Sequence, residues 1–181
     1  MLGPVDLDAL VRSYVPDGDA SSHELALEVL GNGRPMWPRS ELDPGHFTAS
    51  AFVLSPDREE VLLVHHRKLD RWLQPGGHLE SEDFSIEDGA RREVLEETGV
   101  SDLRLLGPAL MRIDAHQIPP FEDEPAHMHF DLGVGFHAGS HEIGPIAEVI
   151  EARWVRYSEL QSFDVDGALT AGAQAVRRAA G

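Results

Sequence analysis

A chain of 181 residues without cysteine and with a formal net charge of −17 is long enough for one domain with an extension. The acidic balance would repel a nucleic-acid polymer, and no apolar run is long enough to span a membrane, so neither is expected as a partner. The absence of cysteine excludes disulfides, a thiolate nucleophile and cysteine-ligated zinc, and it fits a cytoplasmic protein.

Residues 1–44 are predicted to be a helical extension that precedes the main domain at residues 45–181. Apolar side chains recur at helical spacing between Leu7 and Tyr14, and a second short helix is expected to end near Gly31. A loop rich in proline and glycine then leads into the domain. We expect the extension either to cover one side of the domain or to meet a second copy of the chain, which would make the protein a homodimer.

Two strands and a basic stretch are predicted at the start of the domain. Residues 46–54 place apolar side chains at every second position, and residues 61–64 are apolar throughout, as expected for a short strand covered on both faces. In the basic stretch that follows, Arg67, Lys68 or Arg71 could contact a substrate phosphate. The alternative is a solvated connecting loop.

An acidic helix behind a pair of glycines, within residues 76–100, is the strongest pattern in the sequence. Ser85 is a good N-cap, and acidic residues follow it in the first turn, where the helix dipole favours negative charge. Gly99 stands where a C-terminal cap glycine belongs. The spacing therefore predicts a helix between these two caps.

Three carboxylates of this helix are expected to project from one side, because Glu96 and Glu97 follow Glu93 by three and four positions. Like charges at this spacing destabilise an isolated helix, which favours a cation bound between them. Oxygen ligands in this number suit Mg²⁺ or Mn²⁺ rather than Zn²⁺. The alternative is an acidic helix face that is merely solvated.

The same stretch resembles the Nudix box, the signature of the Nudix hydrolases, which is written G-x5-E-x7-R-E-U-x-E-E-x-G-U with U aliphatic. The second half matches at every fixed position, namely Arg92, Glu93, Val94, Glu96, Glu97, Gly99 and Val100. The first half, counted from Gly77, contains one extra residue before Ser85. The carboxylate that braces the box arginine in the family is therefore predicted to be Asp83, with Glu82 as the competing choice.

The resemblance implies an α/β fold, namely an α/β/α sandwich with a mixed central sheet. It also implies hydrolysis of a nucleoside diphosphate linked to another moiety. The implied cofactor is Mg²⁺ or Mn²⁺, and the implied partner is a small phosphorylated nucleotide. ADP-ribose, other nucleotide sugars, dinucleoside polyphosphates and damaged nucleoside triphosphates are all candidate substrates.

The resemblance further implies roles for individual residues. Glu93, Glu96 and Glu97 would bind the metal, and the carbonyl of Gly77 would be a further ligand. Arg92 would orient the carboxylates from within the same helix. Glu93 or Glu96 could also be the catalytic base that takes a proton from the attacking water.

Other candidates for the base lie outside the box. Glu151, with Glu148 before it, stands on a strand predicted at residues 148–155, and the loop at residues 122–124 carries three acids in a row. Family members can take an additional metal ligand or base from the first segment, and a mobile loop could bring a base to the site. Surface charge is the alternative interpretation of both.

The remaining elements predicted are strands at residues 103–106, 110–117 and 127–138 and a helix at residues 168–180. The strand at residues 127–138 alternates without a break, and its polar face carries His127, His129 and Asp131 in a row. This stripe could bind a metal or contact the substrate. The alternative is the ordinary polar face of a strand.

Three functions of other classes compete with hydrolysis. A Nudix-fold sensor would bind a nucleotide without cleaving it, but it would have no need of all three box glutamates. A Nudix-fold isomerase of isoprenoid diphosphates, as that chemistry is known in the family, relies on a cysteine that is absent here. Glutamates that only store a structural cation would stabilise the fold without turnover.

Overall fold

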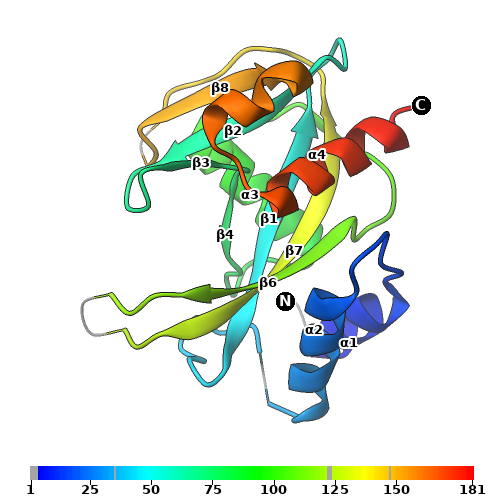
Figure 1. Ribbon diagram of the computed structural model, residues 1–181, viewed down its shortest axis with the longest axis vertical. Coiled ribbons are helices and arrows are strands. Elements are labelled where there is room, and N and C mark those ends of the chain that lie inside the picture. The colour runs from blue at the N-terminus through cyan, green and yellow to red at the C-terminus, as the bar shows by residue number, and fades with distance from the viewer. Residues whose placement is uncertain (1–3, 35, 122–123, 147) are drawn as a thin grey trace.

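A computed structural model describes residues 4–34, 36–121, 124–146 and 148–181 of the chain. Its centre is an eight-stranded mixed sheet, which carries helix α3 on one face and helix α4 on the other (Figure 1). Two N-terminal helices, α1 and α2, lie beside the lower end of the sheet in this view. The α/β sandwich with a mixed sheet and an N-terminal helical segment, as implied by the sequence, is confirmed.

The sheet is organised around β1 and β7, which run parallel and pair from Gly45 opposite Met128 to Leu54 opposite His137. β2 and β4 pair with β1, β3 and β8 pair with β2, and β5 and β6 pair with β7, all antiparallel. The strands are β1 (Gly45–Leu54), β2 (Glu60–His66), β3 (Arg71–Leu73), β4 (Gly76–His78), β5 (Leu103–Leu105), β6 (Arg112–Ile118), β7 (His127–Ala138) and β8 (Glu151–Arg156). The helices are α1 (Pro4–Ser13), α2 (Ser21–Gly31), α3 (Ile86–Thr98), the 3₁₀ helix η1 (Tyr157–Phe163) and α4 (Gly167–Ala179).

The alternation of β1 assigns its two faces to different helices. Phe47 and Ala49 belong to the large core that also contains Val94 of α3. Phe52, on the opposite face, packs with Val176 of α4. Successive side chains of a strand point to opposite faces, and each face of β1 is covered by a helix. β1 is therefore buried along its whole length.

The N-terminal helices share this large core rather than forming one of their own. Leu7 and Val11 of α1 and Ala26 of α2 are fully buried in the same cluster as Phe47. The extension therefore covers one side of the sheet, which is one of the two arrangements expected from the sequence. A domain boundary at residue 44 and contact with a second copy of the chain stay predictions.

The segment before β8 is not a strand, although a strand was predicted from residue 148. Residues 148–150 form a bend, and β8 begins at Glu151. The Arg67 guanidinium donates a hydrogen bond of 3.1 Å to the carbonyl of Val149, and the backbone N–H at the end of the bend donates to His65. These bonds hold the bend against the end of β2.

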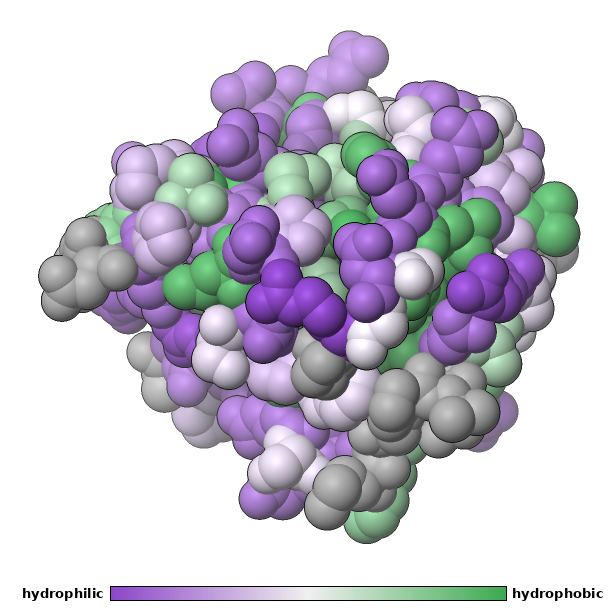
Figure 2. Space-filling model, turned by 90° about the horizontal axis from the view of Figure 1, so that it is seen from below, coloured by the Kyte–Doolittle hydropathy of each residue, from purple (hydrophilic) through white to green (hydrophobic). Residues whose placement is uncertain are grey.

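Hydrophilic residues cover most of the face shown in Figure 2, and apolar residues lie in small groups between them. This mixture agrees with the strongly acidic composition of the chain. Within the described residues, the structure has no helix whose length and apolar character would let it cross a lipid bilayer.

Gly172 of α4 tests the packing of this helix on the sheet. A Cβ atom at this position would lie 2.1 Å from the Cζ atom of Phe52, so Gly172→Ala forces the ring or the helix to shift. Overpacking of this kind costs about 1–3 kcal/mol in the free energy of unfolding, which urea denaturation measures.

The matched control is Gly167→Ala in the first turn of the same helix, where an added Cβ meets nothing within 4 Å. Alanine favours a helix over glycine by about 1 kcal/mol, so this variant should be neutral or slightly stabilised. Equal effects of the two substitutions would contradict the described contact between α4 and Phe52.

Candidate active site

Helix α3 has the two caps that the sequence predicted. The Ser85 hydroxyl accepts a hydrogen bond of 3.1 Å from the backbone N–H of Asp88, and Gly99 adopts the left-handed conformation with φ of 70°. The N–H of Gly99 donates to the carbonyl of Leu95. Because Val94 is turned into the core, the neighbouring glutamates lie along the edge where the helix meets β4.

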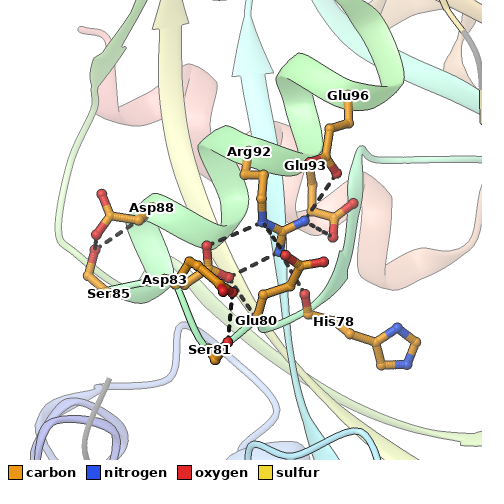
Figure 3. Close-up of polar contacts among 10 residues, drawn as sticks. His78, Glu80, Ser81, Asp83, Ser85, Asp88, Arg92, Glu93 and Glu96 are labelled. Atoms are coloured by element: carbon orange, nitrogen blue, oxygen red, sulfur yellow. Dashed lines mark hydrogen bonds and ion pairs between the residues drawn. The ribbon is translucent and has the colours of Figure 1, made fainter. Parts of the chain in front are cut away.

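Arg92 is the centre of the site, and each of its five N–H donors is used (Figure 3). Two of them bind the carboxylate of Asp83, at 3.2 and 3.0 Å. The others reach Glu93 at 2.9 Å, Glu96 at 3.1 Å and the carbonyl of His78 at 2.8 Å. One guanidinium thus ties the loop before α3, strand β4 and two helix carboxylates together.

The carboxylate that braces Arg92 is Asp83, as predicted, and not Glu82. Asp83 is only 4% exposed, and it also accepts a hydrogen bond of 2.8 Å from the backbone N–H of Glu80. Glu82 accepts from the hydroxyl of Ser81. The extra residue in the loop therefore displaces the brace along the sequence without removing it.

Glu97 and Glu93 are held at the buried edge of the site. Glu97, which is 5% exposed, accepts a hydrogen bond of 3.0 Å from the backbone N–H of Gly76. Burial raises the pKa of Glu97 to about 8, and the carboxylates of Glu93 and Glu148 add to the shift. Burial likewise raises the pKa of Glu93 to about 6, although Arg92 opposes the shift.

Gly77 lies directly against Glu93. A Cβ atom at Gly77 would be 2.5 Å from Oε1 of Glu93, so the carboxylate occupies the space that a side chain would need. The glycine pair at residues 76–77 therefore permits a close approach between β4 and α3. Two of the predicted metal ligands, the backbone of Gly77 and the side chain of Glu93, are adjacent.

The donor set at this edge fits a hard divalent cation. Asp83, Glu93 and Glu96 pair with a single guanidinium, and no side-chain cation pairs with Glu97 within the described residues. Repulsion between carboxylates is one cause of the raised pKa values. Carboxylate and carbonyl oxygens are the ligands that Mg²⁺ and Mn²⁺ prefer.

The segment before β8 contributes Glu148 rather than Glu151 to this neighbourhood. The charge of Glu148 contributes to the raised pKa of both Glu93 and Glu97, after burial as the main cause. The carboxylate of Glu151 instead accepts hydrogen bonds of 2.9 and 2.6 Å from Arg153. The hydrogen bonds that the structure describes for the Glu151 carboxylate are therefore those from Arg153.

The basic residues predicted to contact phosphate are dispersed. Arg67 binds the bend before β8, and the ammonium of Lys68 lies 5.6 Å from the ring centre of Phe121. Arg71 borders an open hollow of about 730 Å³ that none of the box glutamates lines. His65, Trp72, Arg153 and Phe163 are among the other residues that line it.

In the loop at residues 122–124, only Glu124 is described, and its carboxylate pairs with Arg39 at 3.1 Å. Glu122 and Asp123 lie outside the described residues. Glu124 is therefore engaged with the extension rather than with helix α3.

The polar stripe of β7 faces polar residues of β1. Asp131 is buried and accepts hydrogen bonds from the hydroxyls of Thr48 and Ser50, so its carboxylate is already engaged within the sheet. His127 and His129 gather with other imidazoles, and burial is the main cause that lowers the pKa of His129 to about 2.

Sequence reasoning missed the two further histidines of this group, His46 on β1 and His78 on β4. The polar residue His46 at the start of β1 was the sequence signal for this group. In the structure it stands opposite His129 in the parallel strand pair. The pairing partner itself could not be read from the sequence alone.

Comparison with known proteins agrees with the geometry. The NUDIX domain family model matches residues 44–176, which is well over half of the chain. The chain belongs to the Nudix family. It is a Nudix pyrophosphohydrolase, an enzyme of the class that hydrolyses nucleoside diphosphate derivatives.

One curated relative and two solved structures illustrate the likeness. A protein of Bacillus subtilis (strain 168), provisionally named an 8-oxo-dGTP diphosphatase, is 31% identical over 120 residues, which are 66% of this chain and 73% of the relative. A NUDIX family hydrolase from Clostridium perfringens has a TM-score of 0.53 at 24% identity, over 72% of this chain and 95% of that one. The NUDIX domain of Shewanella oneidensis NrtR, solved with ADP-ribose, has a TM-score of 0.51 at 20% identity, over 73% of this chain and 86% of that one.

The brace on Arg92 can be tested by replacing Asp83 and Glu82 separately. Asp83→Asn removes the charge that holds the guanidinium, and losing such a supporting contact typically costs about 10–100-fold in metal affinity or activity. Turnover and the metal concentration for half-maximal turnover are measured together. Glu82→Gln, the matched control, should stay within about twofold, and an equal loss in both variants would contradict the assignment.

Proposed function

We propose that the protein is a metal-dependent hydrolase that cleaves a phosphoanhydride bond in a nucleoside diphosphate linked to another moiety. The observation that carries the proposal is the arrangement around Arg92, whose donors orient Glu93 and Glu96 while Gly76 orients Glu97. This is a set of oriented oxygen ligands that a nucleotide-binding fold would not need for binding alone.

In this proposal Glu93, Glu96, Glu97 and the carbonyl of Gly77 hold Mg²⁺ or Mn²⁺. Divalent ions in such a site neutralise the negative phosphate oxygens and lower the pKa of the attacking water. Arg92 does not touch the substrate. Its role is to keep the carboxylates in one geometry, because every donor of the guanidinium is already used by the protein.

The base is proposed to be a box glutamate, Glu93 or Glu96, or Glu148. Glu93 is a suitable proton acceptor because Arg92 holds its carboxylate beside the other proposed ligands. Glu148 is favoured over Glu151 because its charge acts on both buried glutamates, whereas Glu151 is paired with Arg153.

The substrate proposed for the first assay is a damaged nucleoside triphosphate such as 8-oxo-dGTP. The support is the curated relative, which is named for that activity and is covered over 73% of its length. ADP-ribose, other nucleotide sugars and dinucleoside polyphosphates are the other candidate substrates to be assayed. Lys68 and Arg71 remain the proposed phosphate contacts, and Arg67 is proposed to act indirectly by fixing the bend that carries Glu148.

Substituting Glu97 tests hydrolysis and metal dependence together. Each panel compound is incubated with Mg²⁺ or Mn²⁺, and the products are resolved by chromatography. We expect a nucleoside monophosphate only with metal, and a loss of at least about 100-fold in turnover for Glu97→Gln, because one oriented ligand oxygen is replaced by an amide.

Two outcomes would contradict the proposal in different ways. Full activity of Glu97→Gln would contradict the metal assignment. Tight nucleotide binding by calorimetry without any product, for every compound, would favour the sensor over the hydrolase. The melting temperature of Glu97→Gln in metal-free buffer serves as the control for folding.

The choice between Glu148 and Glu151 is a separate test. Glu148→Gln should lower kcat more than Glu151→Gln, because only the first changes a charge that acts on Glu93 and Glu97. Loss of a general base typically costs about 10²–10⁴-fold. If Glu151→Gln were the more damaging substitution, the bend before β8 would not deliver the base as proposed.

A further inference from the structure

Three imidazoles converge at the end of the sheet where β1 and β7 begin. His46 of β1 stands opposite His129 of β7 in the parallel pair. His127 lies two residues before His129, on the same face of β7. One ring nitrogen from each of the three lies within 4.8 Å of the other two. His46 is fully buried, His127 is nearly so, and His129 is partly exposed, so the group is reachable from one side.

Two of the three rings are oriented by backbone carbonyls. Nδ1 of His46 lies 2.9 Å from the carbonyl of Glu41, and Nδ1 of His127 lies 2.9 Å from the carbonyl of Pro125. A carbonyl can only accept, so both Nδ1 atoms carry the proton and both Nε2 atoms present a lone pair. Histidines that bind metals are usually held in the same way, with the second nitrogen donating to a carbonyl or carboxylate.

A hydrogen bond between imidazoles accounts for only part of this arrangement. Nε2 of His127 and Nε2 of His129 are 3.2 Å apart, so His129 can donate to His127. Nε2 of His46 is completely buried and has no hydrogen-bond partner within the described residues. An oriented lone pair without a partner, aimed at a group of imidazoles, is the feature that the hydrogen bond does not explain.

We propose that His46, His127 and His129 form a binding site for a divalent transition-metal ion, with Zn²⁺ as the first candidate. Imidazole nitrogen suits Zn²⁺ and its neighbours in the periodic table, and it does not suit Mg²⁺. Two nitrogens bound to one tetrahedral zinc are roughly 3.3–3.4 Å apart, close to the spacing between His127 and His129. Three protein ligands leave one position for water.

This site is separate from the box glutamates, although strand β4 borders both. The carbonyl of His78 accepts a hydrogen bond from Arg92, while its imidazole points away from the carboxylates (Figure 3). Gly77 faces Glu93, and successive strand residues face opposite sides. The ring of His78 accordingly lies 5.1 Å from that of His46 and 5.3 Å from that of His129.

The experiment uses the full chain after removal of metal, in buffer with excess Mg²⁺ to occupy the glutamates. Co²⁺ is titrated while its visible absorption is followed, and Zn²⁺ is then added as a competitor. We expect one equivalent of Co²⁺ with the strong absorption of a four-coordinate nitrogen site, displaced by Zn²⁺. His127→Gln and His129→Gln should each weaken binding at least about tenfold.

Glu97→Gln is the matched control and should bind Co²⁺ as the unmodified chain does. The proposal would be overturned if Co²⁺ binding were unchanged in each of the two single histidine variants. It would also be overturned if Co²⁺ binding were lost in Glu97→Gln. Melting temperatures without metal show whether each variant is folded. The X-ray absorption spectrum of the zinc-loaded unmodified chain needs no variant: imidazole scattering is expected, and a shell of oxygens alone would overturn the site.

Discussion

The structure depends on one guanidinium placed among carboxylates that repel one another. Arg92 uses all of its donors, and its partners come from the loop before α3, from β4 and from α3 itself. Removing charges from water is costly unless they are paired and hydrogen-bonded, so this geometry is tolerated only because each donor finds an acceptor. The position of α3 relative to β4, and hence the position of the box glutamates, follows from that set of bonds.

The sheet supplies the rest of the site by bringing distant segments to one edge. The β1–β7 pair forms the buried centre, and β4 adds to β1 so that Gly76 and Gly77 meet the glutamates of α3. The bend before β8 is fixed by Arg67 from the end of β2, and it contains Glu148, whose charge contributes to the raised pKa of Glu93 and Glu97. Strand pairing therefore brings into contact residues that are far apart in the sequence, such as Arg67 and Val149.

Features that depend on local sequence were predictable. The caps of α3 and the alternation of β7 follow from contacts within a few residues. The choice of Asp83 as the brace, nine residues before Arg92, came from the resemblance to the Nudix box. The resemblance to the Nudix box supplied the fold, since the pattern of glycine, arginine and glutamates occurs within one strand–loop–helix unit. The spacing of the glutamates alone did not distinguish a metal site from an acidic helix face exposed to solvent.

Features that depend on strand register were not predictable. Glu148 and Glu151 are the same residue type and close in sequence, and only the bend and the pairing of β8 with β2 separate their environments. The meeting of His46 with His129 requires knowledge that β1 and β7 are parallel neighbours. No periodicity within either strand carries that information.

The most direct test of this account is a crystal structure with Mn²⁺ added, using anomalous scattering to locate the ion. The account predicts a manganese peak roughly 2.0–2.3 Å from carboxylate oxygens of Glu93, Glu96 and Glu97, with Arg92 still bound to Asp83. A crystal containing Mn²⁺ in which the ion binds elsewhere, and in which these glutamates contact only water or one another, would contradict it.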